Sequence, residues 1–132
     1  TIPVHVKGNP NFKTTPPEKI KEEIKKLFDK YNGFIKRKKI SLEEALKFAV
    51  YFHNEFQHIH PFEDGNSRTT RLITFHLLQS LDIPILDIPL GLLDEYLDYT
   101  KGSKNREDLK LYQSLQKIIL FNLRKINKRF LS

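Results

Sequence analysis

The sequence predicts a mostly α-helical domain of four to six helices with a short β-hairpin at its N-terminus, and three observations support this prediction. Apolar residues recur at helical spacing in several separate stretches of the chain. Prolines, glycines and capping residues separate these stretches from one another. The length of 132 residues, of which 39% are hydrophobic, suffices for one core rather than two. We therefore expect one domain over residues 1–132, with the hairpin in 1–16 and a helical core in 17–132.

The first part of the chain predicts the hairpin and then a helix. Residues 2–6 alternate apolar side chains with others and stop at a Gly-Asn-Pro-Asn turn, which is a strand pattern. The Thr-Pro-Pro-Glu run at 15–18 suits a helix start, because a hydroxyl, a proline and an acid all favour the first turn. Apolar residues then follow at helical spacing over 20–31. We expect this helix to end at Asn32-Gly33.

Four more helices are predicted along the rest of the chain. Ser41 and Glu44 form a capping box, which starts the second helix. Pro61 disfavours helical geometry at the preceding residue, so this helix should stop there. Asn66 is a good cap for the third helix. The expected ranges are 42–59, 66–81, 92–99 and 107–129.

The net charge of +7 comes entirely from the last quarter of the chain. Residues 1–100 hold 14 basic and 14 acidic side chains, whereas residues 101–132 hold 9 basic and 2 acidic ones. The chain therefore has a neutral body and a basic C-terminal segment, and nucleic acid is not its expected partner. Most of the basic side chains lie on the last predicted helix: Lys110, Lys117, Arg124, Lys125, Lys128 and Arg129. A solvated helix face explains them; the alternative is a helical module that binds nucleic acid or an acidic protein through this helix.

The composition also predicts the cellular compartment of the protein. The chain has no cysteine, no apolar run near the roughly 20 residues that a membrane span needs, and no signal-peptide pattern. We expect a cytoplasmic protein that makes no membrane contact. The chain opens on Thr1 rather than on a methionine, so we expect that a segment upstream has been removed.

The segment 60–71 places reactive side chains at the start of the third helix. The amides and dipole of a helix start favour an anion, and Arg68 and Arg71 lie on one face because they are three residues apart. Asp64 suits Mg²⁺ held against phosphates, and His60 suits a general base. These residue types fit phosphoryl or nucleotidyl transfer. An ordinary interhelical connection, with Phe62 as a core residue, explains them equally well.

Histidines elsewhere do not indicate a metal site. His53 lies on the apolar stripe of the second helix, which predicts a buried core histidine. His58, His60 and His76 do not have the spacing of metal ligands.

The segment 60–71 resembles the signature of the Fic family, His-x-Phe-x-(Asp or Glu)-Gly-Asn-(Gly or Lys)-Arg-x-x-Arg. Ser67 is the one departure, because the pattern has Gly or Lys there. The predicted hairpin and helices also resemble the Fic core, so the resemblance covers nearly the whole chain. The seven matching residues are His60, Phe62, Asp64, Gly65, Asn66, Arg68 and Arg71.

This resemblance implies a protein adenylyltransferase that moves AMP from ATP to a Ser, Thr or Tyr hydroxyl of a target protein and releases pyrophosphate. His60 would take the proton from the attacking hydroxyl, and Asp64 would hold Mg²⁺ on the phosphates. Phe62 would anchor the loop in the core.

The same resemblance assigns the phosphates of ATP. Asn66 and the amides of Gly65, Ser67 and Arg68 would cradle the α-phosphate. Arg68 would bind nearer the β-phosphate, and Arg71 would reach the γ-phosphate.

Two further roles are implied less specifically. The predicted hairpin, with Val4, His5 and Val6, resembles a flap that docks the target segment, although it could equally be a piece of sheet that closes the core. The adenine pocket has three candidates, which could instead be core residues or a helix cap: Tyr96, Tyr99 and Asn105.

Regulation and close alternatives follow from the resemblance as well. Fic-type de-AMPylation and a kinase-like phosphotransfer are the alternative reactions, and Ser67 argues mildly against the kinase-like one because those chains have Lys there. Residues 103–107 approach the family's inhibitory pattern without completing it. We therefore expect an inhibitory element upstream or on another chain, with this chain active as it stands. Self-modification and a homodimer remain open.

Overall fold

The described part of the protein is almost entirely helical. The computed structural model describes residues 15–59, 65–83, 88–100 and 107–131, and these contain a 3-10 turn, five α-helices and no strand. The predicted helical core is thus confirmed, whereas the predicted hairpin in 1–16 lies almost wholly outside the described residues. The elements are η1 (Pro17–Lys19), α1 (Ile20–Ile35), α2 (Leu42–Ile59), α3 (Asn66–Ser80), α4 (Leu90–Tyr99) and α5 (Asp108–Leu131).

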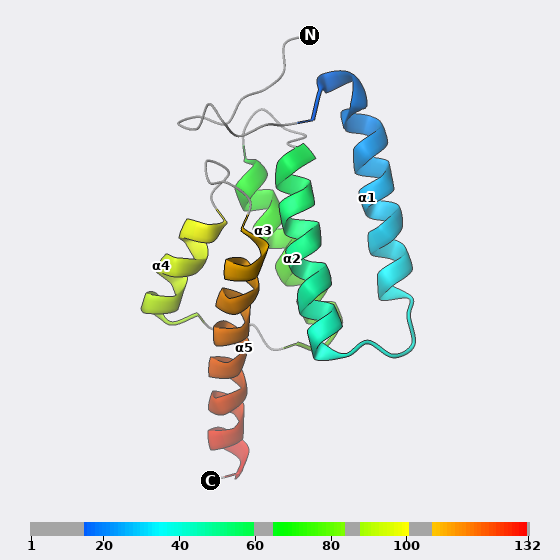
Figure 1. The fold of residues 1–132 in the computed structure, drawn as a ribbon. Coiled ribbons are helices and arrows are strands. Elements are labelled where there is room, and N and C mark those ends of the chain that lie inside the picture. The colour runs from blue at the N-terminus through cyan, green and yellow to red at the C-terminus, as the bar shows by residue number, and fades with distance from the viewer. Residues whose placement is uncertain (1–14, 60–64, 84–87, 101–106, 132) are drawn as a thin grey trace.

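Helix α2 lies at the centre of the fold. It contacts α1, α3 and α5, while α4 packs on α5, as Figure 1 shows. Ten of its eighteen residues are buried, because other helices pack against more than one of its sides. The core that they form with the other helices includes Phe52 and Phe56 from α2, Leu77 and Leu78 from α3, and Leu111, Leu115 and Ile118 from α5.

Helix α1 runs further than its sequence predicts. Its expected end at Asn32-Gly33 is wrong, because the helix continues to Ile35. A Cβ atom at Gly33 would meet nothing within 4 Å, so no close approach requires glycine there. Phe34, one residue later, stacks on Phe48 of α2 with the ring centroids 4.1 Å apart, and this contact offsets the low helix propensity of glycine.

Helix α2 begins with the predicted capping box. The backbone N–H of Glu44 donates to Ser41 Oγ at 3.1 Å, and the Ser41 hydroxyl donates to the Glu44 carboxylate at 3.3 Å. Arg37 pairs with the same carboxylate and is the main cause of the lowered pKa of Glu44, to which the bonds with Ser41 add. The basic stretch before α2 thus contributes to the start of this helix.

The remaining helices follow the predicted order with shifts of one or two residues at their ends. Asp82, with φ of 60°, turns the chain after α3 in a left-handed conformation. Helix α4 starts two residues earlier than expected, after Pro89. Within the described ranges, no helix combines the length and the apolar character that crossing a bilayer would require.

Candidate functional site

The first turn of α3 carries the described half of the segment that the sequence singles out. Gly65 precedes the helix with φ of 80°, a left-handed conformation that glycine adopts without steric cost. Thr69 N–H donates to Gly65 O at 3.0 Å, so Gly65 is the cap. The prediction of Asn66 as the cap is therefore wrong: Asn66 is the first helical residue and is 5% exposed. The left-handed turn at Gly65 displaces the cap by one residue.

Two arginines lie on the first two turns of α3 at different depths. Arg68 is exposed, whereas Arg71 is half-buried. A Cβ atom placed on Gly65 would come 3.1 Å from Nη2 of Arg68, so the guanidinium folds back over the glycine. Arg71 Nη1 donates to Thr100 Oγ1 at 3.2 Å, which ties α3 to the end of α4. Both cations thus lie near the positive end of α3, an arrangement that favours a bound anion.

A buried glutamine connects this turn to two other helices. Gln57 of α2 is 5% exposed, and its Nε2 donates to Ser67 Oγ at 3.1 Å and to Thr100 O at 3.0 Å. Thr100 in turn donates its hydroxyl to Tyr96 O at 2.8 Å. Because Thr100 also accepts from Arg71, a single residue after α4 joins the glutamine and the half-buried arginine. Ser67, the departure from the family pattern, therefore has a partner of its own.

A second chain of hydrogen bonds runs from buried residues of α2 to an exposed aspartate at the start of α5. Asn54 Nδ2 donates to Asp108 Oδ1 at 2.6 Å, which leaves Asn54 Oδ1 as the acceptor for His53 Nδ1 at 3.0 Å. His53 is 1% exposed, as the sequence predicts for a core histidine. Its pKa is lowered to about 4, chiefly by burial; Arg71 contributes to the lowering, while Asn54 and Asp108 oppose it. His53 is therefore neutral at pH 7.

The two tyrosines suggested for adenine lie in or against the core. Tyr96 is 1% exposed and stacks on Phe75 with the centroids 5.6 Å apart. Its burial raises the pKa of its hydroxyl. Tyr99 is half-buried and packs against the core from the same helix. The described stacking partner of Tyr96 is thus a protein ring. The role of the two tyrosines with adenine stays a prediction.

Several predicted site residues lie outside the described ranges. One contact at their border is described: Thr15 N–H donates to His58 O at 3.1 Å, so the chain that follows the predicted flap meets the end of α2 two residues before His60. The residues outside are His60, Phe62 and Asp64 of the motif, Asn105, and Val4, His5 and Val6 of the predicted flap.

Asn54, Gln57 and Thr100 are residues of these networks that the sequence did not lead us to predict. A signal for the first two was present, because Asn54 and Gln57 stand four and seven residues after Val50, at helical spacing along α2. A polar residue on a buried stripe must find hydrogen-bond partners, so it points to a buried polar network. Thr100 offered no such signal, because it lies just beyond α4 and in no periodic pattern.

Comparisons with known proteins identify the family to which this chain belongs. A family model described as Fic/DOC family matches residues 3–78. The protein adenylyltransferase Fic of Culex quinquefasciatus is 33% identical over 73 residues, which are 55% of this chain and 15% of that protein. The protein of the same name from Nematostella vectensis is 30% identical over 78 residues, 59% of this chain and 18% of that protein.

The chain therefore spans less than a fifth of the length of these curated relatives. No solved structure matches the chain. The family model nevertheless covers more than half of the residues and includes the whole segment 60–71, and the chain belongs to the Fic/DOC family.

Proposed function

We propose that the chain is a protein adenylyltransferase, which transfers AMP from ATP to a Ser, Thr or Tyr hydroxyl of a target protein. The observation that carries this proposal is the first turn of α3, where Gly65 is left-handed and two arginines lie beside the helix start. The relatives named protein adenylyltransferase support the class of reaction.

The phosphate cradle is the part of this proposal with described geometry. The amides of Asn66, Ser67 and Arg68 belong to the first turn and point toward the helix start by helix geometry. A side chain on Gly65 would press on Arg68, so glycine leaves room for this guanidinium beside the helix start. We assign Arg68 and Arg71 to the β- and γ-phosphates. A fixed cationic cradle acts mainly by positioning and by stabilising charge in phosphoryl transfer.

The residues before Gly65 supply the chemistry in this proposal. His60 would accept the proton of the target hydroxyl as that oxygen attacks the α-phosphorus, and the bond to the pyrophosphate oxygen breaks. Asp64 is the residue that would hold Mg²⁺, because one carboxylate together with phosphate oxygens is a donor set that Mg²⁺ prefers. The ion would neutralise phosphate charge. Val4, His5 and Val6 would align the target, and the contact between Thr15 and His58 supports a flap near the end of α2.

Labelled ATP tests the proposal. The chain is incubated with Mg²⁺ and either α-labelled or γ-labelled ATP, with and without a cell lysate, and protein-bound label is measured. We expect label from the α position only, and about a 100-fold or greater loss in His60→Ala. His58→Ala is the matched control, because His58 is an exposed histidine in the last turn of α2, two positions before His60 in the sequence.

Two outcomes would contradict the proposal. Label from the γ position alone would indicate phosphotransfer instead of AMP transfer. Equal labelling of the wild type and His60→Ala would show that the segment 60–71 does not carry the reaction.

A further inference from the structure

Thr100, the residue that follows α4, is fully buried and bonded to residues of α2, α3 and α4. Its backbone N–H donates to Tyr96 O at 3.0 Å, and its carbonyl accepts from Gln57 Nε2 at 3.0 Å. Its hydroxyl donates to Tyr96 O at 2.8 Å and accepts from Arg71 Nη1 at 3.2 Å. Thr100 therefore cannot shift without breaking a hydrogen bond to one of these three helices.

These hydrogen bonds also fix the direction of the Thr100 hydroxyl. A threonine hydroxyl has one proton to donate and two lone pairs that accept. Since the carbonyl of Tyr96 takes the proton, a lone pair remains for Arg71, whose guanidinium can only donate. The amide of Gln57 is oriented in the same way, because the Thr100 carbonyl can only accept and so faces the NH₂ group. Thr100 therefore offers an acceptor to Arg71 from a fixed position.

This contact orients Arg71 without cancelling its charge. Among the described residues, the guanidinium of Arg71 pairs with no carboxylate. A carboxylate would neutralise the cation and compete with a phosphate for it. A neutral hydroxyl takes one of the five N–H donors and leaves the others for a ligand. An arginine held in this way is suited to bind an anion.

A second contact between α3 and α4 does not involve the hydroxyl. Phe75 stands one helical turn after Arg71, and Tyr96 stands one turn before Thr100. The rings of Phe75 and Tyr96 stack with their centroids 5.6 Å apart. Loss of the Thr100 hydroxyl should therefore leave the two helices together and remove only the acceptor of Arg71.

We propose that Thr100 is a positioning residue for Arg71 and contributes to the preference of the site for ATP over ADP. This inference rests on the proposed function, in which Arg71 binds the γ-phosphate that ADP lacks. A guanidinium that is already held by an acceptor loses less conformational entropy when a phosphate binds. Removal of the hydroxyl should therefore weaken the binding of ATP and leave that of ADP unchanged.

Binding of two nucleotide analogues tests the inference. The ligands are α,β-methylene ATP and α,β-methylene ADP with Mg²⁺, in which carbon replaces the oxygen of the bond that AMP transfer would break. Isothermal titration calorimetry measures their affinities for the full chain. We expect the wild type to prefer the ATP analogue. Thr100→Val should weaken the ATP analogue about tenfold and the ADP analogue less than about twofold.

Thr100→Ser separates positioning from packing. Valine has the shape of threonine without the hydroxyl, whereas serine keeps the hydroxyl and loses the methyl group. If Thr100 acted by filling space, serine would be the more harmful replacement. We expect the opposite order, with the affinity of Thr100→Ser for the ATP analogue within about twofold of the wild type.

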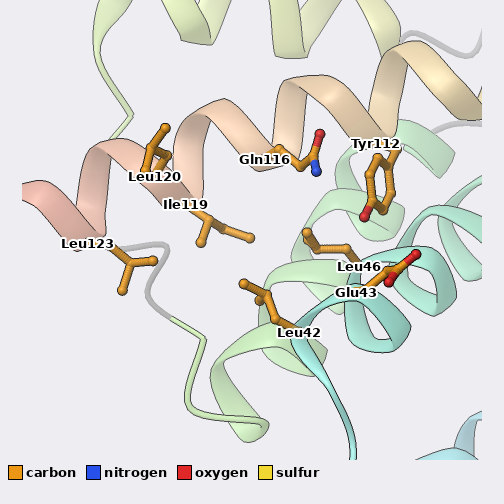
Figure 2. A pocket seen from close by; sticks show the side chains of 8 residues that line it. All are labelled: Leu42, Glu43, Leu46, Tyr112, Gln116, Ile119, Leu120 and Leu123. Atoms are coloured by element: carbon orange, nitrogen blue, oxygen red, sulfur yellow. The ribbon is translucent and has the colours of Figure 1, made fainter.

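Two control variants should bind both analogues as the wild type does, and circular dichroism checks that every variant is folded. Thr74 of α3 is 1% exposed and donates to Thr70 O at 2.8 Å, so Thr74→Val removes a buried hydroxyl of the same kind that has no described bond to Arg71. Leu42 stands 15 residues before Gln57, about 22 Å along α2. Figure 2 shows it on the wall of an open groove between α2 and α5, and Leu42→Ala is the second control.

Four results would overturn the inference. A larger loss in Thr100→Ser than in Thr100→Val would assign Thr100 to packing. Tighter binding of the ATP analogue by Thr100→Val would mean that the hydroxyl holds Arg71 away from the phosphate. Wild-type affinity in Thr100→Val, together with a loss in Arg71→Ala, would remove the role of Thr100 alone. Wild-type affinity in Arg71→Ala would contradict the phosphate role of Arg71 in the proposed function, and this inference with it.

Discussion

The two ends of α2 differ in the polarity and burial of their side chains: one end has buried polar residues, and the other has an exposed apolar residue. At the C-terminal end, His53, Asn54 and Gln57 are polar and buried, and hydrogen bonds connect them to α3, α5 and the residue after α4. At the N-terminal end, Leu42 is apolar and 47% exposed beside exposed leucines of α5.

This difference shows what each end is built to do. Buried polar groups cost free energy unless their partners are fixed, so they hold the surrounding backbone in one arrangement. Exposed apolar groups hold nothing in place and gain free energy only when something covers them. The first end therefore suits a site whose atoms must be positioned, and the second suits association.

Truncating leucines along α5 should give the largest contrast in stability. Leu115→Ala empties a fully buried position and should cost about 2–5 kcal/mol in unfolding free energy. Leu123→Ala should cost about 0.5 kcal/mol or less, because the side chain is already accessible. Urea denaturation of both variants measures the contrast, and similar losses would mean that the end of α5 is covered in solution by the chain itself.

The buried histidine should make stability depend on pH. The pKa of His53 is about 4 in the folded chain against 6.5 for an unperturbed histidine. Below pH 6.5 the unfolded chain takes up a proton that the folded chain excludes, so stability falls as the pH is lowered toward 4, by about 3 kcal/mol in total.

The variant His53→Gln isolates this effect, because the carboxylates and the other histidines titrate in both proteins. Its unfolding free energy, measured in urea between pH 7 and pH 4, should fall less steeply than that of the wild type. Parallel pH profiles would rule out His53 as the source.

Substitution of Arg71 tests whether the site at the polar end of α2 binds phosphate. If Arg71 binds phosphate, Arg71→Ala should lower kcat/KM for AMP transfer about 100-fold, equivalent to about 2.7 kcal/mol. Thr100→Val keeps the guanidinium and removes only the hydroxyl that accepts from it, so its loss should be smaller. Steady-state kinetics with varied ATP measure both. Wild-type kinetics in Arg71→Ala would disprove the phosphate role.

Ser67→Gly should give the smallest effect. It restores the residue type of the family pattern but removes one of the two acceptors of Gln57 Nε2 and places glycine in the first turn, at a cost of about 1 kcal/mol in stability. Transfer activity should change little. A double-mutant cycle with Gln57→Leu should give less than additive losses in urea denaturation, whereas additive losses would show that the two residues do not interact.

Much of the helical layout was predictable, because periodic apolar residues and local caps decide it. The capping box at Ser41 and Glu44 involves residues three apart, so the sequence contains the whole interaction. The end of α1 was not predictable from Asn32-Gly33, since the contact that extends the helix comes from Phe48 on another element.

The same distinction applies to the candidate site. The reactive residues from His60 to Arg71 stand together in the sequence and can be recognised as a motif. Thr100 is 29 positions from Arg71, and only the fold brings the two within 3.2 Å. Gln57 shows an intermediate case, because its place on the stripe of α2 predicts burial without naming its partners.

The conformation of Gly65 limits which amino acids can replace it. Any other residue there would meet an unfavourable backbone at φ of 80° and would also displace the guanidinium of Arg68, which lies 3.1 Å from the position of the new Cβ. A mutation elsewhere could accommodate the guanidinium but not the backbone. A genetic screen for suppressors of Gly65→Ala should therefore return true revertants and few second-site changes.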